Sequence, residues 1–299
     1  MMQPWRSSSL AVGALCGLTV ALIWAGWTIA TRFAVTRTLG PIDVTFLRFG
    51  VSGLLLWPVL ACKGLGLDRM GWRHMAVMLI GAGVPFMMLA STGLRFAPAS
   101  HVATLMIGMM PIFVALLSVL LFGERFTRAQ SVGLLVVVAG VLCVGGHSLF
   151  LNRSSGEWRG DLMFLIAGLL FASYSLAQRR SGISSWHATA LVNVISGVLF
   201  APLYFFVFEP KLLSAPWSDV VVQVLAQGIV VAILGLFFYA ESARRLGAAR
   251  AAVFGSLTPA LSVMMSVPFL GELPATLTLV GVVLVTGGVV VVVTGTRAK

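Results

Sequence analysis

The sequence predicts an all-α membrane protein of ten transmembrane helices, arranged as two inverted repeats of five. Of the 299 residues, 59% are hydrophobic and 10% are charged, and the mean hydropathy is +1.02. A soluble domain of this length has no interior large enough to bury so much apolar surface, so lipid must cover it. An internal repeat with a fixed offset of 148 is the second reason. The residues Pro111, Ser118, Val119, Gly123, Glu124, Gly133, Gly140 and Val141 match Pro259, Ser266, Val267, Gly271, Glu272, Gly281, Gly288 and Val289.

Charged residues mark the helix boundaries, because a helix needs about 20 uncharged residues to cross roughly 30 Å of hydrocarbon. Most uncharged stretches are near or above that length. A shorter one, 49–62, reaches it when it is extended back to Pro41, which brings Arg48 into the membrane. The predicted helices span about 10–33, 41–61, 74–95, 98–121, 129–147, 162–180, 186–207, 219–242, 248–270 and 274–295.

Each copy of the repeat holds an odd number of predicted helices, so the second copy must enter the membrane in the opposite direction. Inverted repeats are typical of secondary transporters, whose substrate site lies near the middle of the membrane between the halves. We expect a first repeat at 1–147, a periplasmic linker at 148–160 and a second repeat at 161–299.

The distribution of basic residues predicts the orientation. With the N-terminus inside, cytoplasmic segments carry about twice as many Arg and Lys residues as outer segments, as the positive-inside rule requires. We therefore expect cytoplasmic N- and C-termini in a multi-pass protein of the cell inner membrane. The same rule accounts for the net charge of +11, and bases scattered over short loops argue against nucleic-acid binding. The stretch 7–31 is interpreted as a retained first helix rather than a signal peptide.

Reactive motifs are missing from the sequence. It contains no H-E-x-x-H, G-x-S-x-G or Walker-type pattern, so we expect neither an enzyme nor an ATPase. Cys16, Cys62 and Cys143 lack CxxC or Cys/His spacing and predict apolar packing instead of a disulfide or a metal site. No cofactor is expected.

A family resemblance rests on three features of the chain. The first helix is rich in aromatic residues and ends in a basic one, from Trp24 to Arg32. A Pro…Gly-Glu pattern follows twice, at Pro111…Gly123-Glu124 and at Pro259…Gly271-Glu272. With ten helices in two EamA-type repeats, the chain resembles the drug/metabolite transporter superfamily, and within it the bacterial aromatic amino acid exporters. The resemblance implies a central cavity lined by helices one, three, four, six, eight and nine, with five and ten at the periphery.

Charge inside the membrane discriminates between substrates, because it is expensive and therefore functional by default. No acid is predicted near mid-membrane, where a proton-coupled exporter of cationic drugs would be expected to place one. Arg48 lies about 10 Å from Pro41 along the second helix, at 1.5 Å per residue. We expect Arg48 to reach the outer interface or pair with Asp43, or else to contact a substrate carboxylate. Its repeat counterpart is Val192.

Aromatic and uncharged polar residues on the cavity helices are the substrate-site candidates. Rings suit an aromatic substrate by stacking and a cation by cation–π contact, but membrane helices also use them for packing. At an offset of 147, Trp24 matches Phe171 and Trp27 matches Tyr174. Gln227 is the preferred substrate contact, because a buried amide is costly to leave unpaired. The full set is Trp24, Trp27, Phe86, Thr104, Phe171, Tyr174, Gln227 and Phe237.

Three prolines and one histidine are the hinge and gate candidates. Pro85, Pro111 and Pro259 lie near the middle of predicted helices, where each removes a backbone donor and frees a carbonyl. The resulting kinks serve either as hinges in alternating access or only for helix packing. His101 opens the fourth helix and is either a pH-responsive gate or an interfacial residue.

These features predict a secondary transporter that exports aromatic and other neutral amino acids, and related metabolites, by alternating access. The alternative is an exporter of aromatic cationic drugs. The expected partners are a small-molecule substrate and the lipid bilayer, and the protein is expected to be a monomer or a homodimer. Gly281, Gly287 and Gly288 of the last helix predict close packing, within the chain or at a dimer interface.

Overall fold

The computed structural model describes residues 4–123, 127–146, 148, 150, 153–246 and 248–295, and their side chains except at 4–9, 153, 248–250 and 252. Every regular element in these ranges is a helix. Ten helical segments of the described chain are long and apolar enough to cross a membrane, which confirms the predicted fold class. They are Leu10–Arg37, Pro41–Lys63, Leu67–Phe96, Ala99–Phe122, Arg128–Gly146, Glu157–Arg180, Ser185–Phe206, Trp217–Leu246, Val253–Leu270 and Thr276–Thr294.

Five spans make up the first half of the chain. The third is longer than predicted and begins at Leu67, because the charges at Arg69 and Arg73 do not prevent a helix from forming outside the apolar region. Its first turn ends at Gly71, whose backbone is left-handed with φ 68°. The elements are α1 (Pro4–Arg37), α2 (Pro41–Lys63), α3 (Leu67–Ala82) with α4 (Val84–Phe96), α5 (Ala99–His101) with the π-helix η1 (Val102–Ile107) and α6 (Met110–Phe122), and α7 (Arg128–Gly146).

The second half follows a short 3-10 turn, η3 (Arg153–Ser155). The eighth span of the chain contains a second π-helical segment between two α-helices, and the ninth span consists of two α-helices. The elements are α8 (Glu157–Arg180), α9 (Ser185–Phe206), α10 (Trp217–Gln223) with η4 (Val224–Leu234) and α11 (Gly235–Leu246), α12 (Ala248–Gly255) with α13 (Thr258–Leu270), and α14 (Thr276–Thr294).

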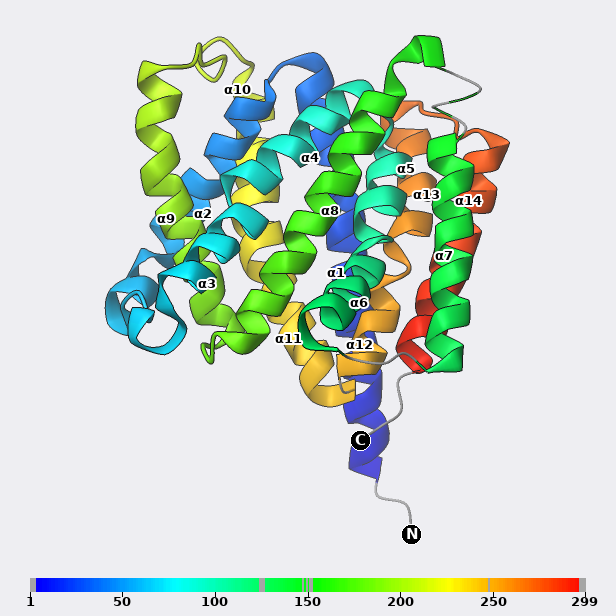
Figure 1. Ribbon diagram of the computed structural model, residues 1–299. Helices are drawn as coiled ribbons and strands as arrows, with labels where there is room; N and C mark the ends of the chain where they lie inside the picture. The colour runs from blue at the N-terminus through cyan, green and yellow to red at the C-terminus, as the bar shows by residue number, and fades with distance from the viewer. Residues whose placement is uncertain are drawn as a thin grey trace.

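The two halves run in opposite directions through the bundle. Figure 1 shows α1 rising from the lower end, whereas α8, the first helix of the second half, descends from the upper end. The last helices behave in the same way, because α7 rises and α14 descends beside it. The fold is therefore a two-repeat fold. We call the end at which α1 begins and α14 ends the proximal end, and the opposite end the distal end.

The antiparallel pair α7 and α14 forms a glycine seam at one edge of the bundle (Figure 1). A Cβ added at Gly133 would lie 2.8 Å from the carbonyl oxygen of Gly288, and one added at Gly140 would lie 2.7 Å from that of Gly281. Gly133 and Gly281 are repeat partners, and so are Gly140 and Gly288. Each glycine thus contacts the partner of the other, as a two-fold axis between the halves requires. Gly287 faces open space instead.

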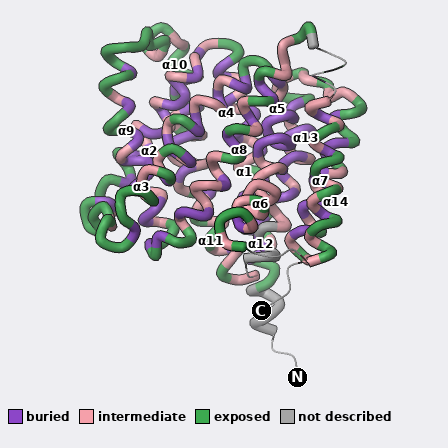
Figure 2. The backbone as a smooth tube through the Cα atoms, viewed as in Figure 1, coloured by how far each residue is buried: buried purple, intermediate pink, exposed green. Residues whose placement is uncertain are grey.

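Apolar side chains cover the outside of the bundle, and polar ones lie within it. Leu54 and Phe206 are 82% and 88% exposed, as expected for a surface in contact with lipid. Figure 2 shows the buried residues along the inward sides of the helices and the exposed residues on the outer sides and loops. Gln223, Gln227 and Asp43 are among the fully buried polar residues, so the interior carries the chemistry of the molecule.

All three candidate prolines lie where a helix is interrupted. Pro85 stands in the first turn of α4, after Gly83 breaks the third span with ψ −147°. Pro111 is the second residue of α6, which begins after the helix widens, with the Gly108 N–H bonded to the Ala103 carbonyl. In a continuous helix, a proline ring clashes with the backbone of the preceding turn. The interruption before each of these prolines removes that clash.

Pro259 is the repeat partner of Pro111, but the helix before it tightens where the other widens. The Leu257 N–H bonds the Phe254 carbonyl, three residues back, and α13 then begins at Thr258. Symmetric prolines therefore break their helices by different local geometries.

Replacing Gly288 with leucine should destabilise the protein, because the added side chain would meet the backbone of α7. Overpacking of this kind costs about 1–3 kcal/mol. We expect Gly288→Leu to lower the thermal unfolding midpoint in detergent, and Gly287→Leu, which points into open space, to leave it nearly unchanged. Equal midpoints for the two variants would contradict the seam.

Candidate functional site

Three of the predicted cavity aromatics form one cluster between α4 and α8. The Phe86 and Phe171 ring centroids lie 5.3 Å apart at an angle of 46°, and those of Phe171 and Tyr174 lie 5.3 Å apart at 55°. Phe86 is buried, while Phe171 and Tyr174 are half-buried. Tilted rings at this spacing stabilise one another and present both edges and faces to a neighbouring group.

The other candidate rings lie elsewhere. Trp24 stacks on Tyr239 of α11, with centroids 6.0 Å apart and an angle of 29°, so it does not share a cluster with its repeat partner Phe171. Phe237 is 56% exposed and contacts Phe238 edge-on, outside both aromatic groups. The exposure follows from its position on α11, two residues away from the face that carries Tyr239 toward α1.

Trp27 and Gln227 are held in one hydrogen-bonded network between α1 and η4. Trp27 Nε1 donates to Gln227 Oε1 at 2.9 Å, and Gln227 Nε2 donates to Thr31 Oγ1 at 2.8 Å. Gln223 joins through its own Oε1 and donates from Nε2 to the Ala30 carbonyl at 2.9 Å. Both ends of the Gln227 amide are occupied by protein partners in this conformation.

A surface groove of about 490 Å³ runs beside this network, between α1 and η4. Trp27 and Gly26 line it from α1, and Leu225 and Val230 line it from η4. Its walls are almost wholly apolar, so it resembles the lipid-facing surface rather than a site for a polar substrate.

The candidate Thr104 and another threonine, Thr28, also find partners inside the bundle. The Thr104 hydroxyl donates to the Ser100 carbonyl of its own helix at 2.7 Å. Thr28 of α1 and Ser262 of α13 bring their hydroxyl oxygens to 3.2 Å across the boundary between the halves. In contrast, the buried hydroxyl of Thr258, at the break before Pro259, has no hydrogen-bond partner among the described residues.

Arg48 is half-buried, and its guanidinium group forms no ion pair with an acid among the described residues. Its Nε is shielded from solvent and has no hydrogen-bond partner among the described residues. The pairing with Asp43 that the sequence suggested does not form. Asp43 is instead satisfied by the N–H groups of Gly40 and Lys211, at 2.7 and 3.0 Å, and by the Tyr204 hydroxyl at 2.7 Å.

A cluster that we call the distal lock joins the two halves at the distal end. Arg32 Nε of α1 lies 2.6 Å from Glu272 Oε1, in the segment between α13 and α14. The same guanidinium donates to the Leu94 carbonyl of α4, and the other oxygen of Glu272 accepts from the Ala99 N–H at 3.1 Å. One ion pair therefore fixes four segments together.

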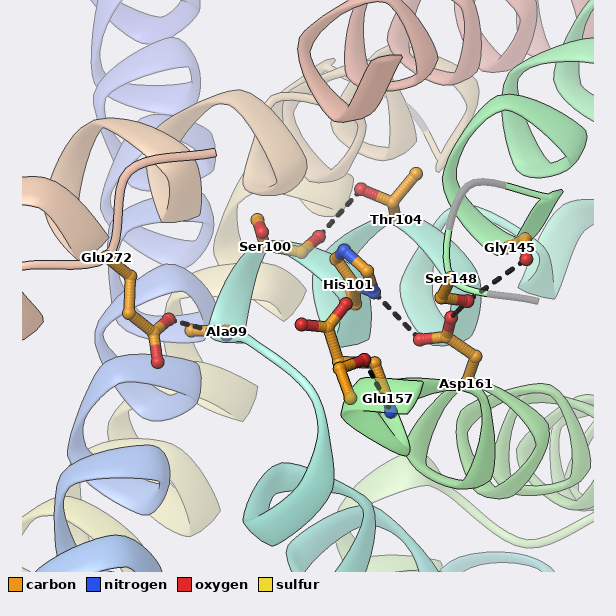
Figure 3. Close-up of polar contacts among 10 residues, drawn as sticks. Ala99, Ser100, His101, Thr104, Gly145, Ser148, Glu157, Asp161 and Glu272 are labelled. Atoms are coloured by element: carbon orange, nitrogen blue, oxygen red, sulfur yellow. Dashed lines mark hydrogen bonds and ion pairs between the residues drawn. The ribbon is translucent and has the colours of Figure 1, made fainter. Parts of the chain in front are cut away.

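His101 lies two residues after Ala99 of this lock and is also paired. Its Nδ1 is 2.8 Å from Asp161 Oδ1, and the other oxygen of Asp161 accepts from the Ser148 hydroxyl (Figure 3). His101 and Asp161 are 3% and 5% exposed, so the pair is buried inside the protein. The pair connects α5 of the first half to α8 of the second.

Sequence reasoning did not identify the distal lock or Asp161 as parts of a site. The signal for the lock was present, since Arg32 ends the aromatic-rich helix and Glu272 belongs to the repeated Gly-Glu pattern. Nothing in the sequence distinguished Asp161 from other acids at helix ends. Glu124, the repeat partner of Glu272, lies outside the described residues.

No group of three or more His, Cys, Asp or Glu residues in the described part of the chain is arranged to hold a metal ion. The three cysteines are free and lie on separate helices. The described site is therefore made of helices, rings and hydrogen-bonded polar groups.

Comparison with known proteins assigns this architecture to a family. The model of the EamA-like transporter family matches residues 11–146 and again 158–294. A solved crystal structure with 21% sequence identity superimposes with a TM-score of 0.61 and covers 93% of this chain and 94% of its own.

Curated relatives include proteins named as exporters. A probable terminal-alkyne amino-acid exporter of Streptantibioticus cattleyicolor is 28% identical, over 95% of this chain and 93% of its own length. The pseudopaline exporter CntI of Pseudomonas aeruginosa is 27% identical, over 90% and 93%. The aromatic amino acid exporter YddG of Ancylobacter novellus is 27% identical, over 63% and 68%. The chain belongs to the EamA-like transporter family: it is a multi-pass transporter of the inner membrane and not an enzyme.

Proposed function

We propose that this protein exports aromatic and other neutral amino acids, and related metabolites, across the inner membrane by alternating access. Relatives named as exporters of amino acids or of a metabolite support the substrate class. Arg48 is the observation that carries the choice of a carboxylate-bearing substrate. A half-buried guanidinium group whose shielded Nε has no partner among the described residues is suited to binding an anion, and its charge opposes the entry of a cation.

The aromatic cluster supplies the second element of recognition. Phe86, Phe171 and Tyr174 offer ring edges to an aromatic side chain. The same rings suit an aromatic cationic drug through cation–π contact, which keeps multidrug efflux as the alternative.

The distal lock is the proposed gate. With both termini in the cytoplasm, as the basic residues predict, the distal end faces outward and the lock closes the protein to the outside. Opening then requires Arg32 and Glu272 to separate. The interruptions at Pro85, Pro111 and Pro259 are the proposed hinges, because the helix there already lacks continuous hydrogen bonding.

The substrate proposal is tested in liposomes with labelled phenylalanine, labelled tryptophan and a quaternary aromatic dye, each with and without a pH difference. We expect both amino acids to move and the dye to be excluded. Movement of the dye alone would replace amino acid export with drug efflux. Loss of all transport without a pH difference would identify a proton-driven exporter.

Arg48→Gln should reduce phenylalanine export by about tenfold, because a charge-assisted bond to the carboxylate is lost. Arg48→Lys should retain part of the activity, since it keeps the charge without the planar fork. The control is Lys63→Gln, which changes a basic residue at the end of the same helix. Full activity in Arg48→Gln would return Arg48 to an interfacial role.

Trp24→Ala should reduce transport while the amount of protein in the membrane stays near normal, because the half-buried ring is expected to line the substrate path. Trp57→Ala removes a ring that is 56% exposed and serves as the control. Initial export rates normalised to protein amount give the measurement. Equal rates for the two variants would make Trp24 an ordinary packing residue.

Glu272→Gln should open the distal end more often, because a neutral amide pairs weakly with Arg32. We expect Ser100→Cys, in a background without native cysteines, to react with an impermeant maleimide about tenfold faster in this variant. Glu241→Gln is the control, since Glu241 pairs only with Arg244 and Arg245 of its own helix. An unchanged labelling rate would show that the distal lock does not act as the gate.

A further inference from the structure

The pair of His101 and Asp161 has a geometry suited to binding a proton. Each oxygen of Asp161 has a polar partner, since Oδ1 lies 2.8 Å from His101 Nδ1 and the other oxygen accepts from the Ser148 hydroxyl. The second ring nitrogen of His101 points away from Asp161 (Figure 3). Adding a proton there makes the ring a cation while Nδ1–H continues to donate to the carboxylate.

The position of the pair couples it to the distal lock. Ala99 and His101 belong to the same short helix, α5. The Ala99 N–H bonds Glu272 of the lock, and the His101 ring bonds Asp161 of α8. A change that loosens His101 from Asp161 therefore frees the segment that the lock holds.

A pocket connects His101 to the surface of the distal end. It has a volume of about 220 Å³, and His101, Ser100, Glu157 and Glu272 line it. Leu273, which also lines it, is 83% exposed, so water reaches this pocket.

Charged groups from three elements surround His101. Asp161 and Glu157 belong to α8, and Glu272 faces the pocket from the segment before α14. Arg32 of α1 is the nearest cation of the lock, and it is paired with Glu272.

We propose that His101 and Asp161 form a proton-binding site that closes the distal gate. A proton from water in the pocket adds to the free ring nitrogen, and the hydrogen bond to Asp161 becomes an ion pair between the two halves. Loss of the proton weakens the pair and favours opening. This proposal rests on the proposed function only for the orientation of the protein in the membrane. With the distal end facing outward, the proton comes from outside the cell and closes the gate after the substrate has left.

The site exists at one end of the protein only. The repeat counterpart of His101 is Ala249, and that of Asp161 at an offset of 147 is Ala14. Neither alanine can titrate. The two ends of an otherwise symmetric frame therefore respond differently to pH, which gives the transport cycle a direction-dependent step.

The test measures gate opening without any substrate. Spin labels at Phe96→Cys and Leu273→Cys, in a full-length background without native cysteines, report the distance between α4 and the segment before α14 in lipid nanodiscs. Between about pH 8 and pH 5, the range in which histidine gains charge, the ratio of closed to open populations should rise about tenfold. His101→Gln should abolish this change, and Asp161→Asn should abolish it and favour the open state at both pH values.

His187→Gln is the matched control, because His187 is also buried and bonds a backbone carbonyl, that of Gly64, at 2.8 Å. It should keep the full pH response. Size-exclusion profiles identify any variant that does not fold, and each remaining variant decides the question alone. A pH response that persists in His101→Gln or Asp161→Asn, or that is absent from the parent protein, would overturn the proposal. Failure of amino acid transport would leave this result intact, because no substrate is present.

Discussion

Hydrocarbon offers no hydrogen bonds, and this constraint governs how the polar side chains inside the bundle are arranged. A side chain that cannot be satisfied by lipid must find its partner on another helix. Gln227 reaches Trp27 and Thr31, Asp43 reaches Tyr204, and Arg32 reaches Glu272. Each of these contacts joins the first half of the chain to the second. These polar contacts therefore hold the two halves of the bundle together in this conformation.

Arg48 departs from this rule in a way that gives it meaning. The energetic cost of a buried and unpartnered guanidinium nitrogen falls when an anion arrives, so the group is prepared for a ligand rather than for a neighbour. Thr258 is a second departure, at the interruption before Pro259. Polar side chains with hydrogen-bond partners stabilise the bundle, while Arg48 and Thr258 remain available to bind a transported substrate.

The number of helices, most of their boundaries and the two-repeat fold could be predicted, because charged residues separate the apolar stretches of the chain. The start of the third span could not, because a helix continues through Arg69 and Arg73. The interruptions also follow from single residues, since Pro111 and Pro259 lack a donor wherever they stand. Lateral partners could not be predicted in this way. In the sequence, Gln227 and Asp161 do not differ from other polar residues. Their partners, Trp27 and His101, become apparent only once the helices are placed relative to one another. The expected pairing of Arg48 with Asp43 failed for the same reason, because Tyr204 and a loop backbone reach the carboxylate instead.

The glycine seam has a consequence for how such a protein can originate and change. Because Gly133 meets Gly288 and Gly140 meets Gly281, the surface is complementary to an upside-down copy of itself. A single five-helix unit inserted in both orientations would already possess this contact before any gene fusion. A larger residue at one seam position cannot be accommodated by a smaller residue at the facing position, because the facing residue is already glycine. The four seam glycines therefore constrain α7 and α14 together, because a side chain added at any one of them meets the backbone of the opposite helix.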